Sequence, residues 1–302
     1  MPELPEVECV GRTLLARVRG VAVRAVDIRR PDVCTTHDAR PVTPRDLLLG
    51  ARITDVVRRG KQLAILADDG RALAVHLGMS GRLSVQAAAP AAEPRPAPHA
   101  HVVWTLDSDL SLVFSDPRRF GGLWTFPSAD ALRLARWSTL GPDALTITPE
   151  QLAGVLRGAA SIKSALLDQR RIAGLGNIYA DEVLFHARIA PQQPAGTLSP
   201  AARDALANAI RCVLTKAIKA GGTTLRDYAD AEGVSGTYQN SHAVYGRAGL
   251  PCTRCGTPLV SDRIAQRTTC WCQQCQPNPT DLSTLGVSTP RSLRANTRPG
   301  GR

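Results

Sequence analysis

Cysteines crowd one short segment near the carboxy end of the chain. Cys252 and Cys255 are separated by two residues, as are Cys272 and Cys275, and sixteen residues lie between the two pairs. This paired spacing is typical of a tetrahedral zinc ribbon, in which two knuckles supply two thiolates each. Because four thiolates leave no open coordination position, we expect one structural Zn²⁺ here. Cys270 has the wrong spacing for a ligand, and the alternative interpretation is a chance cluster of free thiols.

The amino terminus offers a second kind of chemistry. Pro2 follows Met1, and a small second residue favours removal of the initiator methionine, which leaves a secondary amine at the chain start. An α-amino group titrates near pH ~8, so a usable fraction is neutral and nucleophilic at physiological pH. Glu3 lies beside this amine and Glu6 one helical turn further, where a carboxyl can donate and accept protons. The alternative is that these acids only begin a helix, since acids are favoured near its positive end.

Lysine is rare in this chain. Of its 37 basic residues only four are lysines, namely Lys61, Lys163, Lys216 and Lys219. Arginine does not deprotonate in proteins, whereas lysine serves as an acid or a base. Each lysine is therefore a candidate for proton transfer, although an ordinary solvated strand residue is the alternative for Lys61.

The hydrophobic pattern predicts the elements that must position these groups. Residues 5–18 carry apolar side chains at helical spacing. Residues 22–85 switch to period-two patterns with an Asp-Asp-Gly hairpin signal, and strands resume between residues 101 and 126. Residues 1–128 are therefore expected to form one domain, a β-sandwich or barrel with an amino-terminal helix. The Ala- and Pro-rich stretch 86–98 is expected to be a solvated loop.

After Pro127 the period becomes helical. Helices are expected over residues 129–137, 149–157, 161–168, 177–187 and 199–220. The overall class is thus α+β. We expect a helical domain over residues 129–246, a cysteine-bearing module over 247–276, and a disordered basic tail over 277–302.

Composition narrows the class of protein further. The 302 residues are 43% apolar and 21% charged, which excludes a wholly disordered chain, a collagen and a small disulfide-stapled peptide. No apolar run is long enough to cross a bilayer, and the acidic, Pro-rich start is unlike a signal peptide, so a cytoplasmic protein without a membrane partner is expected. The net charge of +11 suits a polyanion such as nucleic acid, while the alternative is that it only aids solubility.

Seven motifs occur in order over residues 1–276. They are MPELPEVE at the start, HLGMSG at 76–81, DPRRFG at 116–121, GLGNIYADE at 174–182, GGTTLRD at 221–227, VYGR at 244–247 and AQRTTCWCQQCQ at the end of the zinc ribbon. Together they resemble the formamidopyrimidine-DNA glycosylase family, the Fpg/MutM branch of the Fpg/Nei glycosylases. The PELPEVE opening is more similar to the Fpg branch than to the Nei branch, whose members usually have Gly in place of Leu4.

The resemblance implies a fold and an activity. The family has a β-sandwich with a leading helix, joined to a helix–two-turn–helix domain with a carboxy-terminal zinc ribbon, and DNA lies in the cleft between them. By resemblance, the chain is a bifunctional DNA glycosylase and AP lyase of base-excision repair. Pro2 is then the nucleophile that forms a Schiff base at C1′, and Glu3 donates a proton at the sugar. Lys61 donates a proton during β-elimination, and Arg267 binds phosphate and serves the δ-elimination.

The DNA-binding residues carry over in the same way. An enzyme that flips a nucleotide out of the duplex leaves a gap in the stack. In the family that gap is filled by residues matching Met79, Arg118 and Phe120, in accord with an apolar wedge that offsets lost stacking. Other positions that match DNA-contact or site residues of the family are His99, Lys163, Asn177, Glu182 and Tyr245. The resemblance thus predicts a single cleft that contains all of these side chains.

Three functions remain open from the sequence. The polar stretch 229–243 resembles the family loop that closes over a flipped oxidised purine, which favours 8-oxoguanine and formamidopyrimidines as substrates. The alternatives are a Nei-like glycosylase for oxidised pyrimidines and a catalytically silent damaged-DNA-binding protein. The presence of Pro2, Glu3 and Lys61 together argues against a silent binder. The expected partner is double-stranded DNA with an oxidised base or an abasic site, bound by a monomer in the bacterial cytoplasm and associated with the nucleoid when bound.

Overall fold

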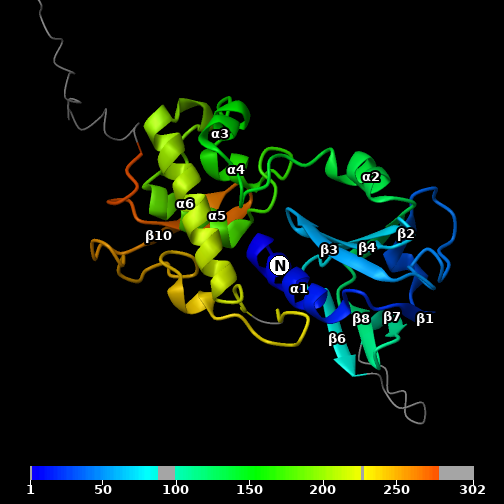
Figure 1. Cartoon of the computed structure of the whole chain (residues 1–302). Coiled ribbons are helices and arrows are strands. Elements are labelled where there is room, and N and C mark those ends of the chain that lie inside the picture. Colours follow the sequence, from blue (N-terminus) through cyan, green and yellow to red (C-terminus); the bar gives the residue numbers. More distant parts are fainter. Residues whose placement is uncertain (1, 88–98, 226–227, 279–302) are drawn as a thin grey trace, which may run out of the picture.

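The computed structural model describes residues 2–87, 99–225 and 228–278. Most of the predicted loop 86–98 and of the predicted tail 277–302 lies outside these ranges. The described chain has two lobes, one of strands and one of helices, and the first helix lies between them (Figure 1). Among the described residues, none of the helices has the length and the apolar character needed to cross a membrane.

The strand lobe is a sandwich of two sheets, as predicted. One sheet has the order β2-β9-β5-β4-β3 and the other the order β1-β7-β8-β6. The strands are β1 (Val23–Ile28), β2 (Cys34–Thr36), β3 (Ile53–Arg59), β4 (Gln62–Ala67), β5 (Ala72–His76), β6 (Arg82–Ala87), β7 (Ala100–Leu106), β8 (Leu110–Ser115) and β9 (Gly122–Phe126). All pairs are antiparallel except β2 with β9. Alternating side chains such as Leu63, Trp104 and Phe114 fill the space between the sheets.

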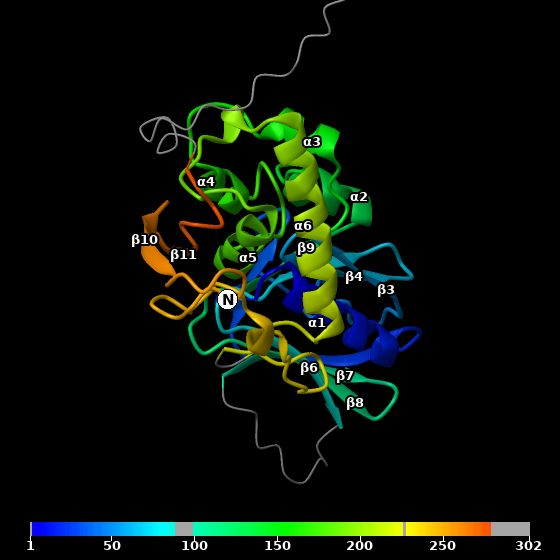
Figure 2. The same ribbon diagram turned by 90° about the vertical axis from the view of Figure 1, so that its left-hand side faces the viewer.

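Helix α1 (Leu4–Val18) joins the two hydrophobic cores. Val7, Leu14 and Val18 pack into the sandwich core, whereas Leu4 belongs to the core of the helical lobe. The view in Figure 2 shows α1 between the strands and the long helix α6. Because the amino terminus begins this helix, the first residues of the chain are fixed at the junction of the lobes.

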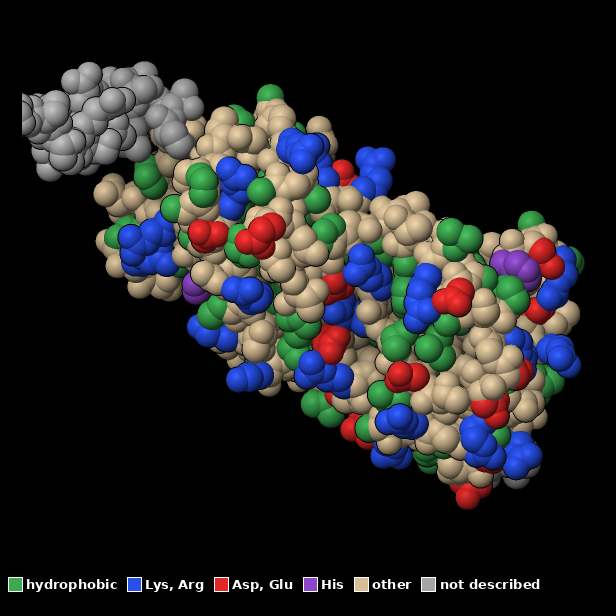
Figure 3. All heavy atoms as spheres, turned by 45° about the horizontal axis from the view of Figure 1, so that its top comes forward, with side chains coloured by type: hydrophobic (Ala, Val, Ile, Leu, Met, Phe, Trp, Pro, Cys, Tyr) green, Lys and Arg blue, Asp and Glu red, His purple; other side chains and the backbone are tan. Residues whose placement is uncertain are grey.

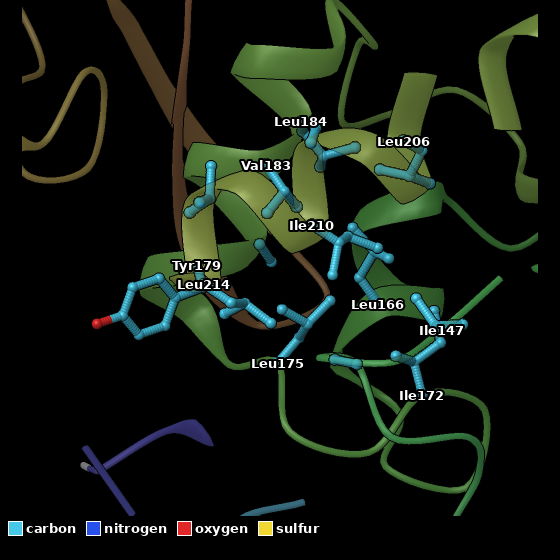
Figure 4. Packing of buried hydrophobic residues seen from close by; sticks show 14 of the residues in the cluster. Ile147, Leu166, Ile172, Leu175, Tyr179, Val183, Leu184, Leu206, Ile210 and Leu214 are labelled. Carbon is cyan, nitrogen blue, oxygen red and sulfur yellow. The ribbon is translucent and has the colours of Figure 1, made fainter. Parts of the chain in front are cut away.

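The helical lobe packs around α5 and α6. Its helices are α3 (Pro149–Val155), α4 (Ile162–Leu167), α5 (Asn177–Ala187) and α6 (Pro200–Lys219). The short helix α2 (Ala129–Leu132) and the π-helical turn η2 (Arg133–Trp137) lie instead on the strand lobe, where Leu132 packs on alanines of β4 and β5. Short 3₁₀ turns are η1 (Pro31–Val33), η3 (Ala195–Thr197) and η4 (Tyr238–Ser241). Figure 4 shows the aliphatic core of this lobe, with the Tyr179 ring at its edge and the hydroxyl pointing away from the cluster. The polar end of Tyr179 is therefore free to serve another site.

The cysteine-bearing module is a hairpin of β10 (Val260–Ile264) and β11 (Arg267–Trp271). It docks on the start of α5 through two hydrogen bonds. Asn177 Nδ2 donates to the Thr268 carbonyl at 2.9 Å, and Asp181 Oδ2 accepts from the Cys270 N–H at 3.1 Å. The position of this hairpin, and of Arg267 at its tip, is thus set by α5.

Candidate active site

The amino-terminal residue that could act as a nucleophile is buried at the lobe junction. Pro2 lines a cavity of about 420 Å³ together with Glu6, Met79, Arg118 and Tyr245. The cavity draws on α1, on two loops of the sandwich and on the helical lobe. Its volume lies within the range of small-molecule sites, so it can hold a single flipped nucleotide base.

The Glu3 carboxylate is fixed against the amino-terminal end of α5. It accepts hydrogen bonds from the N–H groups of Gly176 at 2.7 Å, Ile178 at 2.9 Å and Tyr179 at 3.4 Å, and Glu3 is only 2% exposed. These N–H groups at the amino-terminal end of the helix therefore fix the position and the direction of the Glu3 carboxyl. A Cβ atom at Gly176 would lie 2.4 Å from Glu3 Cδ, and this close approach is the reason for glycine there.

The Glu6 carboxyl has a different environment from that of Glu3. Its Oε2 accepts from the Glu3 N–H at 2.8 Å, and its Oε1 accepts from Tyr179 Oη at 2.5 Å and from the Thr223 N–H at 2.7 Å. Burial, followed by the negative charge of Glu3, raises the pKa of Glu6 to about 7. Glu6 therefore exchanges a proton near neutral pH while lining the same cavity as Pro2.

Lys61 reaches the cleft from the sandwich. It lies in the two-residue turn between β3 and β4 and lines a second cavity, of about 800 Å³, with Glu3, Asn177 and Arg267. Burial lowers the pKa of the Lys61 ammonium. Arg267 lies on the exposed tip of the zinc hairpin, so the two predicted lyase residues approach each other from opposite lobes.

The two cavities adjoin, since Met79 and Tyr245 line both, and together they are called the cleft; an exposed wedge of Met79, Arg118 and Phe120 lies beside it. Met79 lines both cavities and is 44% exposed, while Phe120 is 54% exposed. The Arg118 guanidinium lies 4.7 Å from the centroid of the Phe120 ring. Asp116 joins their loops by accepting hydrogen bonds from Ser80 Oγ at 2.6 Å and from the Arg118 N–H at 3.2 Å. The structure thus brings the three predicted gap-filling side chains together.

Lys163 is placed differently from the prediction of a DNA-facing side chain. It lies on the inner side of α4, is completely buried, and pairs with Asp181. Its ammonium also donates to the Asn177 carbonyl at 3.1 Å. With no exposed surface, Lys163 cannot contact DNA in this structure; instead it fixes the start of α5, on which the zinc hairpin docks. The sequence offers no sign of this, because a helical lysine normally faces solvent.

Glu182 also differs from the prediction of a DNA contact. Its carboxylate is completely buried and accepts from the N–H groups of Ala243, Val244 and Tyr245, each at 2.9 Å. Glu182 therefore positions the chain that carries Tyr245, whose half-buried ring lines both cavities. The remaining predicted residues are accessible to a ligand: His99 is exposed and Asn177 is partly exposed.

The beginning of the stretch 229–243 lies against α1 and β6. The Ala231 N–H donates to Thr13 Oγ1 at 3.1 Å, and the Ala231 carbonyl accepts from the Val85 N–H at 2.8 Å. Just before this stretch, Tyr228 Oη donates to the Glu6 carbonyl at 3.2 Å and lines the Pro2 cavity. Tyr228, directly before this segment, therefore forms part of the wall of the cavity.

Some residues of the site were not predicted individually, among them two that bind the Glu6 carboxyl. Tyr179 and Thr223 hold the Glu6 carboxyl, and the Tyr179 hydroxyl lies 3.0 Å from Thr223 Oγ1. Both belong to motifs that the sequence contains, GLGNIYADE and GGTTLRD. Membership of these motifs was the available signal, but only the fold reveals which residues of a motif face the cavity.

The four predicted zinc ligands converge. The sulfur atoms of Cys252, Cys255, Cys272 and Cys275 all lie within 4.8 Å of one another. The Cys252–Cys275 and Cys255–Cys272 sulfur atoms are 3.9 and 3.5 Å apart, close to the ~3.8 Å edge of a tetrahedron with Zn–S bonds of about 2.3 Å. The donor set therefore fits one structural Zn²⁺, with no position left for a substrate.

Comparisons with known proteins agree with this arrangement. Family models match three segments: the formamidopyrimidine-DNA glycosylase N-terminal domain over residues 1–123, the H2TH domain of the same enzymes over 140–229, and the zinc finger found in FPG and IleRS over 249–278. Formamidopyrimidine-DNA glycosylase from Symbiobacterium thermophilum is 44% identical over 99% of this chain and 95% of its own length. The protein of that name from Pelotomaculum thermopropionicum is 41% identical over 91% of this chain and 99% of its own length.

Solved structures give the same result. The MutM (Fpg) protein from Thermus thermophilus superposes with a TM-score of 0.78 at 38% identity, covering 92% of this chain and 99% of that one. A variant of Lactococcus lactis Fpg in complex with DNA containing Fapy-dG gives a TM-score of 0.80 at 33% identity, covering 92% of this chain and all of that one. The fold and the zinc module are thus common to this chain and to these proteins.

Proposed function

The chain belongs to the formamidopyrimidine-DNA glycosylase family and is a DNA glycosylase of base-excision repair, and from this premise we propose that it excises oxidised purines and then cuts the strand as an AP lyase. The observation that carries the proposal is the placement of Pro2. This residue lies in a cavity with an acid–base group, Glu6, and that cavity shares Met79 and Tyr245 with the one lined by Lys61 and Arg267.

In the proposed first step, the neutral Pro2 amine attacks C1′ of the damaged nucleotide. The N-glycosidic bond breaks, and the base leaves with a proton that Glu6 passes on from the Pro2 amine. Glu3 gives a proton to O4′ as the sugar ring opens, leaving an iminium between the Pro2 nitrogen and C1′. Glu6 is the proposed acceptor for the proton that the amine must lose, because its pKa is about 7 and it lines the same cavity.

The second step is elimination. The iminium acidifies C2′, and loss of a C2′ proton breaks the C3′–O bond and releases the phosphate on that side. We assign the proton transfers of this step to Lys61. Burial lowers the pKa of its ammonium toward the range in which a side chain both gives and takes protons. Arg267 binds the phosphate that leaves when a second elimination breaks the C5′–O bond.

Double-stranded DNA with an oxidised base or an abasic site is the partner. We propose that Met79 and Phe120 fill the gap that the flipped nucleotide leaves in the duplex, and that Arg118 faces the unpaired base on the opposite strand. His99, Asn177 and Tyr245 bind the damaged strand. Lys163 and Glu182 support binding indirectly, by fixing α5 and the chain before the zinc module. On the face shown in Figure 3, basic side chains are spread over both lobes with acidic ones between them. The proposal of DNA binding therefore rests on the individual residues named above and not on a single basic patch.

The domain limits and the location in the cell are also proposals. We divide the chain into a catalytic β-sandwich domain (1–128), a helix–two-turn–helix DNA-binding domain (129–246), a zinc finger (247–276) and a basic tail (277–302). We place the protein in the bacterial cytoplasm, on the nucleoid when bound. The organisms of the related proteins support the bacterial part.

One assay tests the proposal. The protein is incubated with duplexes that carry 8-oxoguanine opposite C, an oxidised pyrimidine or an abasic site, with and without borohydride. A trapped adduct and a nicked strand on 8-oxoguanine are expected. Adducts on oxidised pyrimidines alone would favour a Nei-like specificity, and tight binding without any adduct would favour a silent damaged-DNA-binding protein.

A further inference from the structure

One buried arginine holds the turn that carries Lys61. Arg58, at the end of β3, has a side chain that is only 9% exposed. Its Nε donates to Glu8 Oε2 of α1 at 2.6 Å, and its Nη1 and Nη2 donate to the Asp143 carboxylate at 2.7 and 3.0 Å. Nη1 also donates to the Gly60 carbonyl at 3.0 Å. Arg58 therefore ties α1, the turn and the entry to the helical lobe to one point.

Asp143 completes the contact from the helical lobe. Its Oδ2 accepts from the Gly60 N–H at 2.9 Å, so hydrogen bonds fix both the N–H and the carbonyl of Gly60. Gly60 has a φ of +57°, and a Cβ atom there would lie 3.0 Å from Ala173 Cβ. Beside it, Arg59 Nη2 donates to the Gly141 carbonyl at 2.8 Å. The turn is thus clamped against the second lobe.

The charges of Arg58, Asp143 and Glu8 hold these three side chains together at neutral pH. Although burial raises it, hydrogen bonds from Arg58 bring the pKa of Asp143 below its ordinary value, and the pKa of Glu8 is lowered in the same way. Both carboxylates therefore stay ionised at neutral pH, and the planar guanidinium serves both of them and the Gly60 carbonyl. Removing one partner of a buried pair leaves an uncompensated charge, which is far more disruptive than losing an exposed pair.

We propose that Arg58 and Asp143 are positioning residues for strand cutting: acting through the Gly60 peptide, they aim the Lys61 ammonium into the cleft. This inference rests on the proposed lyase function. Lys61 directly follows Gly60 in a two-residue turn closed by the Arg59–Gln62 pair, so the orientation of the Gly60 peptide sets the direction of the Lys61 side chain. A shift of about 1 Å in a reacting group costs on the order of a hundredfold in rate.

The first test compares two steps on a duplex with an abasic site. In Asp143→Asn, single-turnover strand cutting is expected to fall by about tenfold to a hundredfold, while the rate of borohydride trapping at Pro2 falls less than about threefold. Asp46→Asn is the matched control, because Asp46 is also a mostly buried carboxylate paired with an arginine, Arg40, but outside both cleft cavities. An equal loss in both steps, or the same loss in the control, would overturn the proposal.

The second test asks whether the effect passes through Lys61. In a Lys61→Ala background, Asp143→Asn is expected to slow strand cutting by less than about twofold, since the group that it positions is gone. A merely structural role predicts that the two losses multiply. Multiplying losses would therefore contradict the proposal, even if each single variant behaves as expected.

A third readout does not depend on activity. The rate at which an amine-reactive reagent labels Lys61 is measured across pH by mass spectrometry in the wild type, Asp143→Asn and Arg58→Lys. The last variant keeps the charge but loses the planar fork. Faster labelling of Lys61 in both variants, with Lys216 and Lys219 unchanged, is expected. Unchanged labelling would contradict the positioning role of Arg58 and Asp143. Absence of any trapped adduct in the wild type would instead contradict the proposed function.

Discussion

The carboxyls of Glu3 and Glu6 in the cleft and the exposed side chains of Met79 and Phe120 in the wedge are held in opposite ways. Both carboxyls are buried and receive three hydrogen bonds each: Glu3 from N–H groups at the start of α5, and Glu6 from the Glu3 N–H, the Tyr179 hydroxyl and the Thr223 N–H. The wedge residues are about half exposed and lie on loops. Groups that must meet a reacting atom need fixed geometry, whereas a wedge must enter a duplex that brings its own shape.

This difference predicts that substitutions in the buried junction between the lobes reduce activity and stability far more than substitutions in the wedge do. The zinc module belongs with the junction, because its hairpin docks on Asn177 and Asp181 of α5. Junction residues should therefore affect rate and folding, and wedge residues should affect DNA affinity.

Loss of zinc should give the largest effect. Chelation, or Cys255→Ser, is expected to unfold the module over residues 249–278 and to abolish strand cutting, because a small module of this kind folds only with its metal. Limited proteolysis and the nicking assay measure both outcomes. Cys212→Ser is the control, since Cys212 is exposed on α6 and outside the cluster. Full nicking by zinc-free protein would contradict the docking role.

Glu3→Gln should come next. Base excision from an 8-oxoguanine duplex is expected to fall by about 10² to 10⁴-fold, the usual range for a general acid. Cutting at a ready-made abasic site should fall less, because an abasic sugar is already in equilibrium with its open aldehyde form and depends less on a proton given to O4′. Single-turnover rates on the two duplexes measure this, with Glu150→Gln, on the exposed first turn of α3, as the control. Equal losses on both duplexes would contradict the role of Glu3 as the proton donor to O4′.

Glu6 should make the stability of the protein depend on pH. Its pKa is about 7 in the folded protein and 4.5 ordinarily, so between these values the folded state binds more protons than the unfolded state. The free energy of unfolding should therefore fall by about 3 kcal/mol as pH rises from 4.5 through 7. Urea unfolding of wild type and Glu6→Gln at pH 5 and pH 8 measures the difference. The same slope in both proteins would show that Glu6 is not the titrating group.

Met79→Ala should give the smallest effect. We expect roughly tenfold weaker binding to a lesion duplex, in line with the loss of one stacking contact, and an unchanged melting temperature, because the side chain is exposed. Leu134→Ala is the control, as Leu134 is an exposed apolar residue that lines neither cavity. A stability loss in Met79→Ala would mean that the wedge is part of the folded core.

Local signals in the sequence predicted much of this molecule. Helix α5 was predicted over the residues it occupies, and the Cys-x-x-Cys pairs predicted the metal ligands, because spacing alone determines both. Whether the strands form a sandwich or a barrel was left open by the period-two pattern. That choice depends on which strands pair, and β1 pairs with β7, far along the chain.

Burial of charged residues was not predictable in the same way. Lys163 and Glu182 were predicted as DNA contacts from the resemblance, yet both are completely buried, Lys163 against Asp181 and Glu182 against the N–H groups of residues 243–245. Arg58 and Asp143 meet across the lobe junction, and neither belongs to a quoted motif. Only the folded chain shows which charges face one another, so positioning residues are the part of the site that sequence reasoning misses.

The proposed glycosylase and lyase mechanism depends most directly on the Pro2 amine. The adduct trapped by borohydride on an abasic-site duplex can be digested and its modified peptide identified by mass spectrometry. We predict that the sugar is attached to the peptide that begins at Pro2, in protein that has lost Met1. An adduct on Lys61, or full strand cutting by protein that retains a formylated Met1, would contradict the account.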